Sequence, residues 1–99
     1  MALTIEFSRR STNQLQKILA FYDERNASDV YSRRLLRCLL EDLQRLAQTP
    51  TASSPSTQPD VRFFYLMGFT IIFRYNKRKL TVLSIRSSAL KPLKFYQRQ

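Results

Sequence analysis

Histidine is absent from the chain, and Cys38 is its only cysteine. Transition-metal sites in proteins depend mainly on histidine nitrogen and cysteine sulfur, so this composition argues against a metal centre. A single cysteine cannot close an intrachain disulfide, which fits a reducing compartment. Because Cys38 lies in a leucine-rich helical pattern, we expect its thiol to be buried as a small apolar group. The sequence thus predicts a cytoplasmic protein with no metal and no cofactor.

Glycine is nearly absent as well, since Gly68 is the only one in the chain. Phosphate-cradling loops need several glycines close to the ligand, so a nucleotide-binding loop of this kind is excluded. No window approaches the roughly 18 apolar residues that cross a bilayer, and the first ten residues lack the apolar core of a signal peptide. We therefore expect no association with a membrane.

Acidic residues are scarce in the second half of the chain. Residues 51–99 carry nine Lys/Arg against Asp60 alone, whereas residues 1–50 carry eight against six acidic residues. Most of the net charge of +10 therefore lies in one half. Such asymmetry is typical of a face that meets a polyanion, with nucleic acid or an acidic protein segment favoured over a membrane surface. A cationic surface that serves only solubility is the alternative.

Hydrophobic residues make up 43% of the 99-residue chain, which predicts one folded domain over residues 1–99. The alternating "LTIEF" (3–7) predicts a half-buried strand. The next segment, "STNQ", is typical of a capping box, with Ser11 as N-cap and Gln14 reaching back to it. This helix is expected to end near Asn26, before a second helix that Ser28 caps.

The second helix carries the clearest pattern in the chain, an apolar stripe at three- and four-residue steps. Its members are Leu36, Leu39, Leu40, Leu43, Leu46 and Ala47. The stripe spans fewer than two heptads, which favours packing on a core over a coiled-coil seam. Three prolines in residues 48–60 predict a loop inside the domain. Because the connection between the two helices is short, they are expected to form an antiparallel hairpin.

Three strand patterns follow, over residues 61–67, 69–75 and 80–86, with turns at Gly68 and at "NKRK". Short turns between successive strands predict an antiparallel meander. The predicted fold class is α+β: an N-terminal strand, a helical hairpin and a three-stranded meander, with the helices on one face of the sheet. A basic tail over residues 91–99 completes the chain.

Placed in this order, the segments "IEFSRRS", "LQKILAFYDERNASDVYSRRLLRCLLEDLQRLAQTP" and "VRFFYLMGFTIIFRYNKRKLTVLSIRSSALKP" resemble the RelE/ParE superfamily of bacterial toxins. The resemblance covers about residues 3–92. It implies the toxin of a type II toxin–antitoxin system, which inhibits growth and is neutralised by a cognate antitoxin with an acidic or amphipathic segment. RelE-like members are ribosome-dependent mRNA endoribonucleases, whereas ParE-like members inhibit DNA gyrase and have no hydrolytic site.

Cleavage of RNA through its 2′-hydroxyl needs a base, a cation on the phosphate and an acid for the leaving oxygen. The resemblance implies that histidine is not required, because RelE-like enzymes use arginines on the sheet face and a tyrosine or a histidine near the C-terminus. The corresponding candidates in this chain are Arg62, Arg74, Arg86, Lys91 and Tyr96. Alternation places Thr70, Ile72 and Arg74 on one face of their strand.

Two positions depart from the RelE-like pattern. Where those relatives carry arginines, after the "GF" of the middle strand and before the final proline, this chain has Thr70 and Ala89. Loss of one transition-state donor costs on the order of 3 kcal/mol. The departures favour gyrase binding over ribonuclease activity, while a non-toxic basic nucleic-acid-binding module is a third possibility. For target or nucleic-acid binding the candidates are Arg74, Lys77, Arg78, Lys79, Arg86, Lys91 and Lys94.

Overall fold

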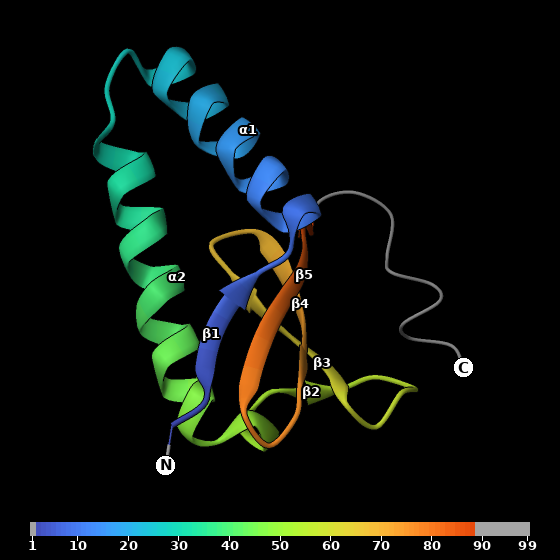
Figure 1. The fold of residues 1–99 in the computed structure, drawn as a ribbon. Helices are drawn as coiled ribbons and strands as arrows, with labels where there is room; N and C mark the ends of the chain where they lie inside the picture. Colours follow the sequence, from blue (N-terminus) through green and yellow to red (C-terminus); the bar gives the residue numbers. More distant parts are fainter. Residues whose placement is uncertain (1, 89–99) are drawn as a thin grey trace.

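The structure is a computed structural model, and it describes residues 2–88. In chain order the elements are β1 (Thr4–Phe7), α1 (Arg9–Asn26), α2 (Val30–Gln48), the 3₁₀ turn η1 (Pro50–Ala52), β2 (Ser54–Pro55), β3 (Val61–Leu66), β4 (Phe69–Tyr75) and β5 (Lys79–Ser87). The predicted α+β order, a strand, two helices and then the strands, is confirmed (Figure 1).

The strands form one mixed sheet in the order β1-β5-β4-β3-β2. The predicted antiparallel meander is present as β3–β4–β5. β1 lies at the far edge and pairs in parallel with β5, with Ile5 opposite Leu80 and Phe7 opposite Val82. Parallel neighbours need a long crossover connection, and here the helical hairpin is part of it. The first and last strands of the fold thus lie side by side (Figure 1).

The main hydrophobic core lies between the sheet and the helices. Leu35, Leu39, Leu43 and Leu46 of α2 pack with Phe73, Leu80 and Val82 of the sheet. The buried stripe differs from the predicted one. Leu36 and Leu40 were predicted to belong to it, but Leu36 is half-buried and Leu40 is 40% exposed, whereas Leu35 is buried. A helix turns 3.6 residues at a time, so the face that starts at Leu35 continues at Leu39 and Leu43. The thiol of Cys38 is only half-buried, against the expectation of burial.

The start of α1 differs from the predicted capping box. Ser8 is the N-cap, and its Oγ accepts a hydrogen bond from the backbone N–H of Ser11 at 3.1 Å. Ser11 is fully buried inside the helix, and its Oγ donates to the Val82 carbonyl at 2.9 Å. Both serines could cap a helix by residue type. Because the hydroxyl of Ser11 is bonded to β5, 71 residues away in the sequence, Ser8 and not Ser11 is the N-cap.

Gln14 is also part of this junction, because its Oε1 accepts a 2.7 Å hydrogen bond from the backbone N–H of Ile85. β5 carries an extra residue beside Ile72 and Phe73 of β4. Such a bulge disturbs the regular hydrogen-bond ladder. Side chains from the first turns of α1 therefore supply bonds to β5 at and after the bulge.

We expect Gln14→Ala to lower the free energy of unfolding by about 1–3 kcal/mol, because it removes the acceptor of a partly buried backbone N–H. Urea unfolding measures this difference. Gln14→Glu, which keeps a carboxyl oxygen of similar reach, is the matched control and should retain most of the stability. Equal stability of the alanine and glutamate variants would contradict this role for Gln14.

The predicted loop over residues 48–60 is partly ordered into regular structure. Its first residue closes α2, η1 follows, and Ser54 and Pro55 pair with Phe63 and Arg62 as the edge strand β2. Proline has no backbone N–H to donate to a neighbouring strand. On the outer side of an edge strand no such donor is needed, which explains why this short strand tolerates Pro55. The turn between β3 and β4 is formed as predicted, with Gly68 at φ 86°.

Candidate functional site

The turn between β4 and β5 projects from the sheet and is held by Asn76. Its Oδ1 accepts from the backbone N–H groups of Arg78 and Lys79, at 2.7 and 2.9 Å. The Asn76 backbone N–H donates to the Lys79 carbonyl at 3.0 Å. An asparagine that bonds backbone groups two and three residues ahead fixes a turn. The sequence contained this signal in "YNKRK", although Asn76 was not among the predicted site residues.

We call Arg74, Lys77, Arg78 and Lys79 the basic tip. Two of its cations are engaged within the chain: the Arg74 Nε lies 3.0 Å from a carboxylate oxygen of Asp60, and Lys79 pairs with Glu6 at 3.3 Å. Lys77 and Arg78 are exposed and form no ion pair within residues 2–88. Within the basic tip, the positive charge that is free of an ion pair is therefore that of these two residues.

The guanidinium of Arg62 forms hydrogen bonds within the fold and is not presented on an open surface. Its Nε donates to Ser53 Oγ at 3.0 Å, and its guanidinium also donates to the carbonyls of Thr51 and Ser53. These bonds tie the segment after α2 to β3. Arg62 lies opposite Phe73, so strand alternation places it on the other face of the sheet from Arg74.

Arg86 lies at the opposite end of the sheet from the basic tip. It pairs in register with Thr70, which is four residues from Arg74, or about 13 Å along an extended strand. There Arg86 and Lys17 line a pocket of about 310 Å³ whose other walls include Ile18 and Phe69. Arg86 thus joins a second cationic area beside α1.

The described candidates for catalysis are not gathered at one point. Arg62, Arg74 and Arg86 occupy two faces and two ends of the sheet. Lys91 and Tyr96, together with the binding candidate Lys94, lie outside the described residues. Within residues 2–88 no group of three or more acidic or cysteine side chains is placed to hold a metal ion. No helix in that range is long and apolar enough to cross a membrane.

Thr70 occupies the position at which the RelE-like pattern has an arginine. It is only 4% exposed, and its hydroxyl lies 2.8 Å from the hydroxyl of Ser88. Thr70 therefore offers only a neutral hydroxyl that is already engaged with Ser88, and the cation opposite it in register is Arg86 on β5. Ala89, the second departure, lies outside the described residues.

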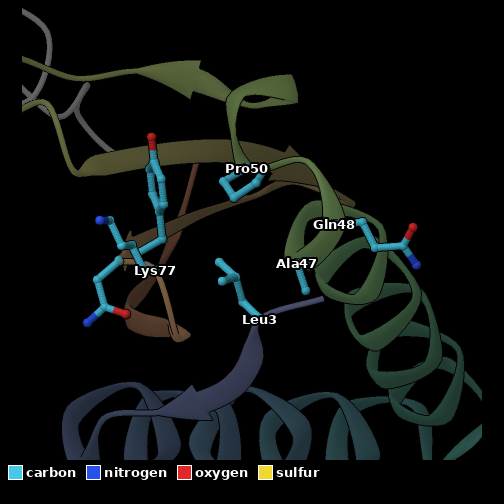
Figure 2. A pocket seen from close by; sticks show the side chains of 7 residues that line it. Leu3, Ala47, Gln48, Pro50 and Lys77 are labelled. Carbon is cyan, nitrogen blue, oxygen red and sulfur yellow. The ribbon is translucent and has the colours of Figure 1, made fainter. Parts of the chain in front are cut away.

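A pocket of about 380 Å³ lies beside the basic tip. Leu3 lies in its middle, with Lys77 on one side and Ala47 and Gln48 on the other, beneath Pro50 (Figure 2). Residues 75 and 76 complete the lining. The first strand, the end of α2 and the tip turn thus meet here from three distant parts of the sequence.

A family model described as the ParE toxin of the type II toxin–antitoxin system, parDE, matches residues 5–91. The chain belongs to the ParE toxin family. Its fold is similar to a chain of a solved structure of the chromosomal ParDE system from P. aeruginosa, with a TM-score of 0.69 and 19% identity over 87% of this chain and 96% of that one. A comparison with curated protein sequences gives no significant match.

Membership in the ParE family confirms the resemblance drawn from the sequence and assigns this chain the role of toxin in a toxin–antitoxin system. A protein with this role has a cognate antitoxin as its partner. In this ParE-family chain the basic tip lies beside the pocket at Leu3, and Arg86 forms a separate cationic area with Lys17.

Proposed function

We propose that this ParE-family toxin arrests growth in the cytoplasm by binding DNA gyrase and inhibiting it, without cutting RNA. The observation that carries the proposal is Thr70, which is buried at the position of a RelE-like arginine and has its hydroxyl in hydrogen-bond contact with that of the exposed Ser88. Phosphoryl-transfer transition states depend on preorganised cations and hydrogen-bond donors. A hydroxyl already engaged with its neighbour is a poor replacement for a guanidinium.

The other arginines support the same proposal. Arg62 donates hydrogen bonds to carbonyl and hydroxyl oxygens, and Arg74 forms an ion pair with a carboxylate, so each guanidinium already has partners within the chain. Arg86 lies about 13 Å from Arg74 along the strands, and its side chain lines the pocket beside Lys17, whereas Arg74 is paired with Asp60. Inhibition by binding requires only a complementary surface, which the basic tip offers.

We assign target binding first to Lys77 and Arg78, because their charges have no partner within residues 2–88. Arg74, Lys79 and Arg86 contribute further positive charge, as do Lys91 and Lys94 beyond the described residues. Exposed charges of one sign steer a partner of the opposite sign and raise the association rate.

Induced expression in bacteria tests this function. We expect growth arrest, a shift of a reporter plasmid toward relaxed topoisomers, and an unchanged map of cellular RNA 5′ ends. Co-expression of the adjacent gene, if it encodes a small acidic protein, should restore growth. New RNA ends within codons, with unchanged plasmid topology, would contradict the proposal and favour the ribonuclease. Normal growth would favour a non-toxic basic module.

A further inference from the structure

The pocket beside the basic tip is preformed by backbone hydrogen bonds. The Leu3 N–H donates to the Ala47 carbonyl at 2.9 Å, and the Thr4 N–H donates to the Arg78 carbonyl at 3.0 Å. These bonds join β1 to the end of α2 on one side and to the tip turn on the other. Asn76 holds the turn itself through two more bonds. A partner would therefore meet walls that are already in place, which lowers the entropic cost of binding.

The pocket is apolar in its middle and charged on one side only. Leu3, Ala47 and Pro50 provide apolar walls, and the volume of about 380 Å³ falls in the range of roughly 300–1,000 Å³ common for ligand sites. Lys77 lies on the side away from Ala47 and Gln48 (Figure 2). Gln48 is the last residue of α2, whose C-terminal end carries partial negative charge.

The uneven distribution of charge around the pocket indicates which kind of ligand it can bind. A nucleic-acid backbone would bring several phosphates across the pocket, including the side at which α2 ends, where negative charge is disfavoured. One apolar side chain with a carboxylate next to it fits both halves, because the apolar group fills the middle and the carboxylate meets Lys77. Lys77 has no ion-pair partner within residues 2–88 to compete for it.

We propose that this pocket anchors an acidic segment of the cognate antitoxin, which inserts one large apolar side chain beside Leu3 and places a carboxylate against Lys77. The inference rests on membership in the toxin family and not on the choice of gyrase as target. An antitoxin bound here would also cover one of the two uncompensated cations of the basic tip. Neutralisation would then follow from competition for Lys77.

The test uses the full-length, ¹⁵N-labelled toxin and three synthetic pentapeptides as probes. The first has phenylalanine at its centre and acidic residues around it, the second replaces the phenylalanine with alanine, and the third keeps it but replaces the acids with their amides. We expect the first peptide to bind about 10-fold more tightly than the second, because burial of the ring provides much of the affinity. The third peptide should also bind several-fold more weakly than the first. Amide shifts should centre on Leu3, Ala47 and Lys77.

Charge variants separate the pocket from general electrostatic attraction. Lys77→Glu should weaken binding of the first peptide about 5-fold or more. Arg10→Glu makes the same change in net charge at the other end of β1, on the exposed first turn of α1, and should change affinity less than about 2-fold. The amide spectrum of each variant reports whether it is folded.

Several results would overturn the proposal: equal affinity for the phenylalanine and alanine peptides, equal effects of the two charge variants, shifts away from the pocket, or no binding at all. Displacement of the bound peptide by purified gyrase, but not by the antitoxin, would also overturn it, since the pocket would then serve the target.

Discussion

Phe73→Ala is expected to lower the free energy of unfolding by about 3–5 kcal/mol, enough to unfold much of the population in a domain of this size. Phe73 is 0% exposed at the centre of β4. Its ring lies 6.2 Å from that of Phe64 and 6.4 Å from that of Tyr75, between centroids. Truncation removes apolar area and leaves a cavity that the neighbouring strands cannot fill without breaking their pairing.

Urea unfolding followed by far-UV circular dichroism measures the loss for Phe73→Ala. Phe21→Ala is the matched control, since Phe21 is 53% exposed and contacts only Tyr22 and Arg25 among the ring interactions of the described residues. The control should lose less than about 1 kcal/mol. Similar losses for the two variants would contradict the assignment of Phe73 to the centre of the core.

The second large effect concerns the basic tip. We expect the double variant Lys77→Glu, Arg78→Glu to bind gyrase about 10–100-fold more weakly at low salt, with a smaller difference at high salt. Two exposed cations without ion-pair partners in the described chain become anions, and the favourable field toward an acidic partner is reversed. Surface plasmon resonance at two salt concentrations measures both the affinity and the association rate.

The control for the tip is Arg9→Glu, Arg10→Glu, which makes the same change in net charge on the exposed first turn of α1. Acidic residues at a helix N-terminus are favourable, so this variant should remain folded. Its gyrase affinity should fall by less than about 3-fold. Equal losses for the two pairs would show that net charge, and not the tip, determines binding.

The strands of the meander could be predicted from the sequence because their signals are local. The run of β-branched and aromatic residues over 69–75 and the turn at Gly68 define β4 without reference to the rest of the chain. The start of α1 could not be predicted in the same way. Ser8 and Ser11 are equivalent by local pattern, and the hydrogen bonds that distinguish them go to Leu83 and Val82 of β5.

For the candidate site, the sequence showed which residue types are present but not which partners their side chains bind. The cations of the second half are evident from composition, but the bonds of Arg62 to Ser53 and of Arg74 to Asp60 depend on how β2, β3 and β4 are placed. The pocket at Leu3 was missed for the same reason. Its walls come from β1, the end of α2 and the β4–β5 turn, and no short window of sequence contains them.

Purified toxin in two parallel reactions provides the most direct test of the central claim, that this chain acts by binding gyrase and not by cutting RNA. One reaction contains gyrase, ATP and relaxed plasmid, and the other contains ribosomes programmed with a defined mRNA. If the chain acts by binding gyrase, supercoiling is inhibited while the mRNA remains intact. Cleavage of the mRNA on the ribosome with normal supercoiling, abolished by Arg74→Ala or Arg86→Ala, would contradict that claim.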